Sequence, residues 1–273
     1  MQPLDAFPIA ARRKVRGVLV DIDDTLTTDG RLTAEAYGAL ERLHDAGLLV
    51  VPITGRPAGW CDHIARVWPV DAVVGENGAF YFRYDRDRRS VERRYAADGA
   101  TRAANRVRLD ALKDDILAAV PEAGVASDQA YREADLAIDY REDVAPLDAA
   151  DVARIVDICE TAGATAKFSS IHVNGWFGTY DKLAMTRILF DEAFGIDLDG
   201  EAASFVFVGD SPNDAPMFAF FPHAVGVANV RDFADQLAAA PAYVTEARAG
   251  ADFAEIAAHF LAAGAGLPGD GAR

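Results

Sequence analysis

Three carboxylates lie within four positions of the segment DIDDTLT, at residues 21–27. They are Asp21, Asp23 and Asp24, and they follow the run GVLV, whose continuous hydrophobic pattern is typical of a buried parallel strand. Their mutual repulsion at the end of a strand costs stability, so their presence together points to a chemical role.

A second acidic segment, GDSPND, occupies residues 209–214 and follows the apolar run SFVFV. It supplies Asp210 and Asp214. In open α/β sheets, ligands bind beyond the carboxyl ends of parallel strands. If the two strands are neighbours, we expect Asp21, Asp23 and Asp210 to converge at one edge of the sheet.

Such a cluster needs a partner of opposite charge. Two carboxylates about 4 Å apart repel by about 4 kcal/mol at an effective dielectric near 20, whereas a whole domain is stable by only about 5–15 kcal/mol. The groups must therefore stay protonated or bind a cation. Oxygen ligands without a partnering histidine favour Mg²⁺. Aspartates are also common in turns without any ligand, but two clusters that each end a buried strand favour a site.

The predicted secondary structure differs between the two ends of the chain and its middle. Towards both ends of the chain, buried strand-like runs alternate with helical patterns, which is typical of a doubly wound α/β sheet. In the middle, strands alternate polar and apolar residues and two amphipathic helices interleave with them, which indicates an antiparallel sheet with helices on one side. We therefore predict a Rossmann-like parallel-sheet core, residues 1–82 and 178–273, with an inserted α+β cap domain, residues 83–177.

The composition narrows the possible partners. The chain has 273 residues, 51% of them hydrophobic, and a formal net charge of −16, so we expect a packed protein that binds neither nucleic acid nor anionic membrane. Cys61 and Cys159 have no metal-binding spacing and favour reduced thiols. Without a recognisable signal peptide or membrane span, we expect a soluble cytoplasmic protein, a monomer or a small homo-oligomer.

Five motifs in this order resemble the haloacid dehalogenase superfamily, specifically subfamily IIB, whose members carry a large α/β cap. DIDDT matches the pattern Asp-x-Asp-x-Thr, ITGR at 53–56 matches the second motif, and ENGA at 76–79 matches the segment before the cap. Lys182 matches the lysine that opens a helix after the cap, and GDSPND matches the acidic fourth motif. Sucrose-phosphate phosphatase and mannosyl-3-phosphoglycerate phosphatase are similar in motif layout.

The resemblance implies roles for the acidic residues. Asp21 would attack phosphorus and form an aspartyl-phosphate. Asp23 would protonate the leaving oxygen and later deprotonate the attacking water. Mg²⁺ would be held by Asp21, the backbone carbonyl of Asp23, Asp210 and Asp214, the last directly or through water.

The resemblance also implies a phosphate-binding set. Thr54 and nearby backbone N–H groups, including Gly55, would bind the phosphoryl oxygens. Lys182 would stabilise negative charge on the nucleophile and the phosphoryl group. Asn213 would orient the loop or a phosphoryl oxygen.

The segment SIHVNGW, at residues 170–176, is a candidate substrate surface in the cap. Strand alternation predicts that His172, Asn174 and Trp176 share the face towards the active site, while Ile171 and Val173 pack on the cap helices. Two hydrogen-bonding groups and an indole suit a hydroxyl-rich ligand. A solvated strand face is the alternative interpretation.

These observations predict a Mg²⁺-dependent phosphatase that hydrolyses a phosphomonoester of a small metabolite, most simply a sugar phosphate. One alternative is a phosphomutase or phosphotransferase of the phosphomannomutase type, which shares the motifs and the cap. Another is a non-catalytic ligand-binding protein, although every acidic and basic motif position is filled in this chain.

Overall fold

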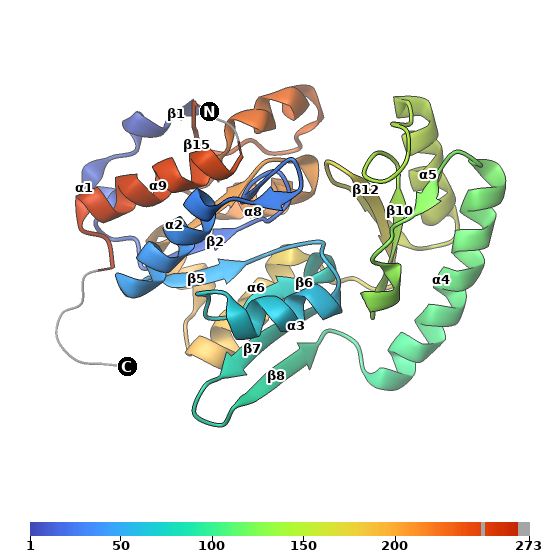
Figure 1. Ribbon diagram of the computed structural model, residues 1–273, viewed down its shortest axis with the longest axis horizontal. Coiled ribbons are helices and arrows are strands. Elements are labelled where there is room, and N and C mark those ends of the chain that lie inside the picture. Colours follow the sequence, from blue (N-terminus) through green and yellow to red (C-terminus); the bar gives the residue numbers. More distant parts are fainter. Residues whose placement is uncertain (247–248, 267–273) are drawn as a thin grey trace.

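The computed structural model describes residues 1–246 and 249–266 of the chain. The described residues form two lobes, a larger one built from the first and last parts of the chain and a smaller one built from its middle (Figure 1). Across the described residues, no helix combines the length and the apolar composition needed to cross a membrane.

The larger lobe is built on a six-stranded sheet in which every neighbouring pair is parallel. In spatial order its strands are β1 (Gln2–Pro3), β15 (Tyr243–Val244), β14 (Val225–Gly226), β13 (Phe205–Gly209), β2 (Gly17–Val20) and β5 (Leu49–Pro52). The strand that precedes Asp21 thus lies beside the strand that precedes Asp210, because Val20 pairs with Val208.

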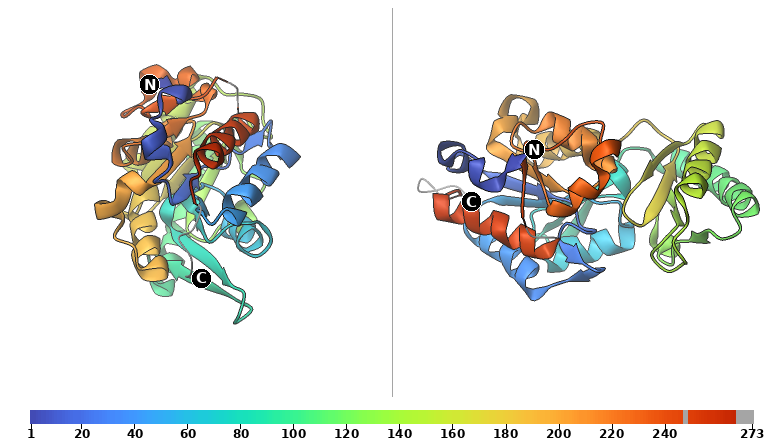
Figure 2. Two further views of the ribbon diagram at one scale, coloured as in Figure 1. Left: turned by 90° about the vertical axis from the view of Figure 1, so that its left-hand side faces the viewer. Right: turned by 90° about the horizontal axis from the view of Figure 1, so that it is seen from above.

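Helices cover both faces of this sheet, which is the doubly wound arrangement predicted from the alternation of elements (Figure 2). Val18 and Val20 pack on one side with α2 (Ala34–Asp45), α3 (Ala58–Val67) and α9 (Gly250–Ala263). Leu19 packs on the other side with α6 (Lys182–Leu189) and α8 (Ala215–Phe220). Both faces of the strands are buried, which explains their uninterrupted apolar sequence.

Shorter elements complete this lobe. They are α1 (Ile9–Arg12), α7 (Leu198–Glu201), the hairpin β3 (Thr27–Thr28) and β4 (Arg31–Leu32), a π-helical turn (Phe190–Phe194), and 3₁₀ segments at Leu4–Ala6, Glu76–Gly78, Ala202–Ser204, Pro212–Asp214 and Ala228–Gln236. The segment Pro212–Asp214 begins at Ser211 with a capping box, which fixes the acidic loop after β13.

A three-stranded antiparallel sheet borders the parallel one. It consists of β6 (Val73–Gly75), β7 (Phe80–Asp85) and β8 (Ser90–Tyr95), and a bridge between Ile53 and Val74 joins it to the segment after β5. Phe80 and Phe82 of β7 belong to the core of the larger lobe. Because β7 runs past residue 83 and pairs with β8, we propose that the inserted unit begins after Tyr95 rather than at residue 83.

The smaller lobe, called the cap below, is a four-stranded antiparallel sheet with two helices on one face. The strand order is β11 (Thr165–Phe168), β12 (His172–Trp176), β10 (Asp135–Asp139) and β9 (Gly124–Val125), and a 3₁₀ turn spans Gln129–Tyr131. Helices α4 (Gly99–Ala119) and α5 (Ala149–Thr161) pack on this sheet around Leu112, Ile155 and Val173. The sheet lies between these helices and the larger lobe, called the core below (Figures 1 and 2).

The predicted fold class is therefore confirmed: a Rossmann-like parallel-sheet core carries an inserted α+β cap.

Candidate active site

Three carboxylates meet at the carboxyl edge of the parallel sheet. Asp21 follows β2, Asp210 follows β13, and Asp214 ends the 3₁₀ segment after it. The backbone N–H of Asp21 donates to the carbonyl of Val208 at 2.9 Å, which holds the two loops together. One oxygen from each carboxylate lies within 4.8 Å of the other two, and all three side chains are buried. The pairing of β2 with β13 brings Asp21 and Asp210 together, as the sequence predicts. Asp23, also expected to converge with them, lies outside this cluster and forms an ion pair with Arg56.

Lys182 inserts its ammonium group into this cluster. Its Nζ donates to Asp21 Oδ1 at 2.8 Å and to Asp214 Oδ1 at 2.7 Å. Lys182 is the first residue of α6, and the Asp181 side chain caps this helix by accepting from the N–H of Ala184. The start of α6 packs on Gly78, where an added Cβ would lie 2.0 Å from the Asp181 carbonyl oxygen. A close approach that only glycine permits therefore sets the position of the lysine.

The cluster carries more negative charge than Lys182 can offset. Burial raises the pKa of Asp21 to about 7, against the opposing effect of the Lys182 charge. Burial, together with the Asp21 charge, raises the pKa of Asp210 well above its ordinary value. Burial alone would lower the pKa of Lys182, but the carboxylates of Asp21 and Asp214 raise it above its ordinary value. The site thus holds a permanent cation and stabilises a further positive charge.

The donor atoms fit a hard divalent cation. Asp210 Oδ2 is buried and has no hydrogen-bond partner among the residues that the structure describes. Both oxygens of Asp214 are engaged, Oδ1 by Lys182 and Oδ2 by the N–H groups of Asp210 and Ser211 at 3.1 and 3.4 Å. An all-oxygen set of this kind could bind a metal ion through Asp21 and Asp210, with Asp214 holding the loop and the lysine in place.

The predicted phosphate-binding residues surround the same edge. Gly55 and Asn213 line a small cavity beside Asp21, and the Asn213 Oδ1 accepts from the Ser211 hydroxyl at 2.8 Å. Thr54 is fully buried and does not line this cavity, because its Oγ1 accepts from the backbone N–H of Arg56 at 3.0 Å. In this structure Thr54 shapes the turn after β5.

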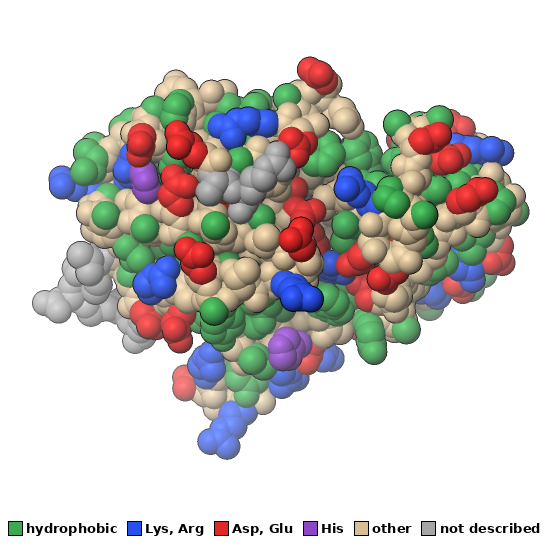
Figure 3. Space-filling model, turned by 45° about the horizontal axis from the view of Figure 1, so that its top comes forward, with side chains coloured by type: hydrophobic (Ala, Val, Ile, Leu, Met, Phe, Trp, Pro, Cys, Tyr) green, Lys and Arg blue, Asp and Glu red, His purple; other side chains and the backbone are tan. Residues whose placement is uncertain are grey.

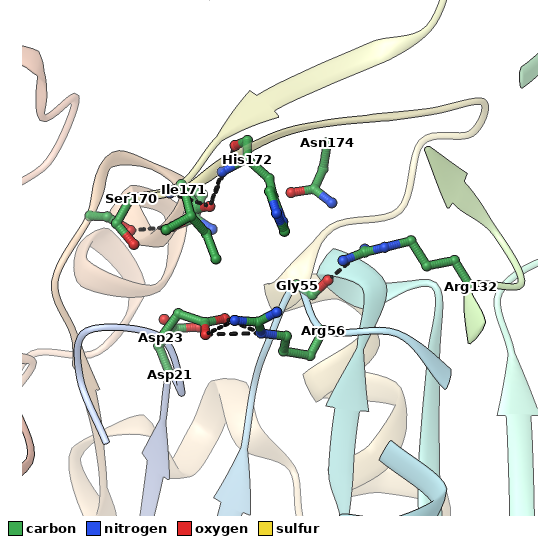
Figure 4. Close-up of a pocket in the computed structure, with 12 residues that line it drawn as sticks. Asp21, Asp23, Gly55, Arg56, Arg132, Ser170, Ile171, His172 and Asn174 are labelled. Atoms are coloured by element: carbon green, nitrogen blue, oxygen red, sulfur yellow. Dashed lines mark hydrogen bonds and ion pairs between the residues drawn. The ribbon is translucent and has the colours of Figure 1, made fainter. Parts of the chain in front are cut away.

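The cap contributes His172 and Asn174 to the opposite wall of the cavity (Figure 4). His172 Nε2 lies 2.9 Å from Glu142 Oε2. Asn174 Nδ2 donates to Asp135 Oδ2 at 2.9 Å. Two of the three cap side chains expected to face the active site therefore line the cavity.

The prediction that Trp176 faces the active site is wrong in one respect: it lies on the predicted strand face but does not line the cavity. Its indole stacks on Tyr180, with ring centroids 5.8 Å apart, and its Nε1–H donates to the Tyr180 carbonyl at 3.3 Å. It is buried and does not line the cavity. Trp176 is the last residue of β12 and shares a strand face with Asn174. It nevertheless lies beyond the end of the cavity, where Tyr180, in the segment that leads to α6, covers it.

The expected packing of Ile171 on the cap helices is also wrong, because Ile171 lines the cavity. Strand β12 begins at His172 rather than at residue 170. Ser169 forms a turn before it, with its N–H donating to the His172 carbonyl at 2.9 Å. Strand alternation therefore does not extend back to Ile171.

Two connected spaces separate the core from the cap. The inner cavity beside Asp21 offers only about 10 Å³ to a water-sized molecule. The outer cleft, of about 740 Å³, is lined by Asp24, Asp210 and Glu142 among others. Acidic side chains gather along this boundary between the two lobes (Figure 3). The outer cleft is thus an electronegative approach to a nearly closed inner site.

Part of the chain is similar to a known protein family. Residues 18–104 match the family model described as haloacid dehalogenase-like hydrolase. This match covers about a third of the chain and includes the segments DIDDT, ITGR and ENGA. A comparison with curated proteins gives no match.

Several solved structures share the fold over nearly the whole chain. A Thermoplasma acidophilum protein is 20% identical with a TM-score of 0.68, and 90% of this chain aligns with 98% of that one. The sucrose-phosphatase of Synechocystis, solved with sucrose and phosphate, is 17% identical with a TM-score of 0.62 and the same coverage. A subclass IIB sugar phosphatase of the superfamily is 14% identical with a TM-score of 0.60, and 90% of this chain aligns with 96% of that one.

The sequence motifs did not predict several residues that line or contact the cavity. Arg56, Arg132, Ser170 and Ser211 line it, and Glu142 contacts two of its lining residues. Arg56 is the last residue of the ITGR motif, so the motif contained a signal for it. Ser170 and Ser211 lie within the SIHVNGW and GDSPND segments, whereas no sequence pattern marks Arg132 or Glu142, which reach the site from the cap.

Proposed function

We propose that the protein is a Mg²⁺-dependent phosphatase that hydrolyses the phosphomonoester of a small metabolite, most simply a sugar phosphate. The observation that carries the proposal is the placement of Asp21. One of its carboxylate oxygens is bound by Lys182 at 2.8 Å, and Asp210, with its unpartnered Oδ2, belongs to the same cluster. This is the environment that an attacking carboxylate needs, because the positive charge beside it offsets the negative charge of an incoming phosphoryl group.

The chain supplies the groups for two successive displacements. An Asp21 oxygen forms a bond to phosphorus while the bond from phosphorus to the leaving oxygen breaks, and Asp23 gives that oxygen a proton. Asp23, now a carboxylate, then takes a proton from water as the water attacks phosphorus. The bond from phosphorus to Asp21 breaks, which releases inorganic phosphate, restores the Asp21 carboxylate and leaves Asp23 protonated for the next cycle.

Lys182 and the loop after β5 hold the reacting group during these steps. The ammonium lies between Asp21 and Asp214, where it neutralises charge that accumulates on the phosphoryl oxygens. Gly55 and Asn213, from different loops, line the space where those oxygens would bind. Mg²⁺ held by Asp21, the carbonyl of Asp23 and Asp210 would supply Lewis-acid stabilisation of the same charge.

The cap supports a hydroxyl-rich leaving group. His172 and Asn174 present a ring nitrogen and an amide towards the cavity, and Ser170 adds a hydroxyl beside them. These side chains suit hydrogen bonding to sugar hydroxyls. The similarity to proteins described as a sucrose-phosphatase and a sugar phosphatase supports this substrate class.

A phosphate-release screen tests the proposal. Purified protein is incubated with a panel of sugar phosphates and other phosphomonoesters, with Mg²⁺ or with EDTA. We expect Mg²⁺-dependent release of free phosphate that is strongest for one or a few sugar phosphates. Isomerisation of a sugar phosphate without net phosphate release would instead indicate a mutase, and no reaction with any ester would reject the proposal.

A further inference from the structure

The side chain of Arg56 forms contacts with both the core and the cap in the site. Its side chain is 6% exposed. On the core side, Nε lies 2.9 and 3.0 Å from the two carboxylate oxygens of Asp23, and Nη2 lies 2.7 Å from Asp23 Oδ1. On the cap side, Nη2 lies 2.9 Å from Glu142 Oε1 and Nη1 lies 3.3 Å from Asp128 Oδ2. One guanidinium thus binds one core carboxylate and two cap carboxylates.

The orientation of Asp23 depends on this guanidinium. Within residues 1–246 and 249–266, Arg56 is the only side chain recorded in a hydrogen bond or ion pair with the Asp23 carboxylate. Asp23 lies in the loop after β2, and its side chain is 17% exposed. Two of the three contacts fall on Oδ1, so the proton that Asp23 needs as a general acid displaces only one contact if it binds Oδ2, that of Nε at 3.0 Å.

The position of Arg56 depends in turn on the cap. Glu142 and Asp128 hold two sides of the guanidinium, and the Trp60 ring lies against its face at 4.5 Å. The pKa of Glu142 is lowered to about 2 by its hydrogen bond with His172 and by the bond and charge of Arg56. Both members of the Glu142–Arg56 pair are therefore charged at neutral pH, so the contact is broken by movement of the cap rather than by titration.

The space beside Asp21 is too small for a substrate in this structure. The inner cavity, at about 10 Å³, holds about one water molecule. Arg56 and Asp23 line both the inner cavity and the outer cleft of about 740 Å³, and Glu142 lines the outer cleft. A phosphate ester is larger than the inner cavity, so the residues that line it, Arg56 among them, must shift before an ester can bind beside Asp21.

We infer that Arg56 is a positioning residue that couples closure of the cap to proton transfer by Asp23. The inference rests on the proposed phosphatase function. With the cap displaced, Arg56 loses two of its three carboxylate partners, and Asp23 loses its fixed orientation. When the cap closes over bound ester, Glu142 and Asp128 fix Arg56, and Arg56 aims Asp23 at the leaving oxygen. Proton donation is thereby restricted to the closed site.

The dependence on leaving group tests the link from Arg56 to Asp23. An alkyl phosphate such as a sugar phosphate needs a proton on its leaving oxygen, whereas p-nitrophenyl phosphate releases a stable phenolate without one. In Arg56→Gln, we expect kcat/KM for the alkyl ester to fall about 10²-fold, at the lower end of general acid contributions, with a smaller loss for the aryl ester. Arg56→Lys keeps the positive charge but lacks the planar guanidinium, so its kcat/KM for the alkyl ester should lie between those of the wild type and Arg56→Gln. Equal losses for both esters, or no loss, would overturn the inference.

The substitution Glu142→Gln tests the link from the cap to Arg56 without altering Asp23 or Arg56. We expect the same change in the ratio of alkyl to aryl kcat/KM, of smaller size. The matched control is Glu192→Gln, which removes an exposed pair with Arg94 at 3.1 Å and lines neither space. An unchanged ratio in Glu142→Gln would remove the cap from the mechanism.

Hydrogen–deuterium exchange tests the coupling without turnover. The N–H groups of Glu133, Ala134 and Asp135 in the cap donate to the Glu76 carboxylate of the core, at 2.9, 2.6 and 3.1 Å. These amides therefore report whether the cap is docked. In Glu142→Gln and Arg56→Gln they should exchange several-fold faster than in the wild type and in Glu192→Gln. Unchanged exchange contradicts the coupling even if the phosphatase assay succeeds, whereas faster exchange without any turnover supports the contact and rejects the proposed function.

Discussion

Replacement of Lys182 by methionine removes the one ammonium in the acidic cluster while keeping a long side chain. Lys182 is buried, and its Nζ lies within 2.8 Å of Asp21 and 2.7 Å of Asp214. In Lys182→Met, these carboxylates and Asp210 face one another without a lysine. Removing one partner of a buried ion pair typically costs about 3–5 kcal/mol of folding free energy, because the remaining charge stays buried without compensation.

This cost can be read from thermal unfolding. For a chain of this size, each kcal/mol shifts Tm by about 2–4 °C, so we expect a fall of about 6–20 °C in EDTA. Added Mg²⁺ should raise the Tm of Lys182→Met by more than it raises that of the wild type, because the cation then offsets a larger excess of negative charge. Differential scanning fluorimetry at several Mg²⁺ concentrations measures both effects.

A variant on the same helix provides the control. Arg187→Met removes an exposed pair with Asp199 at 2.8 Å, and exposed pairs contribute only about 0–1 kcal/mol. If Lys182→Met loses no more stability in EDTA than Arg187→Met, or if Mg²⁺ stabilises it no more than the wild type, the electrostatic account of the cluster is wrong.

Three further predictions concern other residues. Asp210→Ala should weaken Mg²⁺ binding in calorimetric titration and raise the Tm of the metal-free protein, since it removes a carboxylate from a repulsive cluster; unchanged affinity would exclude Asp210 as a ligand. Burial raises the pKa of Asp252 from 3.8 to about 6, so its contribution to stability falls as pH rises through that range. Asp252→Asn should therefore stabilise the protein at pH 8 by at most about 3 kcal/mol and have little effect near pH 4, and equal effects at both pH values would contradict this. Trp176→Ala should destabilise the cap by about 3–5 kcal/mol yet leave the preference between a sugar phosphate and p-nitrophenyl phosphate unchanged; a changed preference would place Trp176 at the substrate.

The parts of the site that follow from strand ends could be predicted from the sequence. Asp21 and Asp210 each follow a continuous apolar run, and parallel strands in one sheet present their carboxyl ends at the same edge. The position of Lys182 at the start of a helix came from its motif. In each case, local pattern and sheet topology are enough to place the side chain.

The contacts between core and cap could not be predicted in this way. Arg56 is 33 residues from Asp23 and 86 residues from Glu142 in the sequence. The periodicity of apolar residues predicts helices and strands but not contacts between two lobes. The turn at Ser169 moved the start of β12 and so reversed the expectation for Ile171. The alternating pattern of β8 resembles a cap strand, although its pairing with β7 places it beside the core.

The central claim is that Asp21 is the nucleophile, and trapping the intermediate tests it most directly. Borohydride reduces an aspartyl-phosphate to homoserine, which peptide mass spectrometry locates in the sequence. During turnover of the preferred phosphomonoester, we predict homoserine at position 21 in the wild-type protein and none in Asp21→Asn, with turnover abolished in that variant. Trapping at a different residue, or turnover by Asp21→Asn protein that mass spectrometry shows to be free of deamidation, would contradict the account.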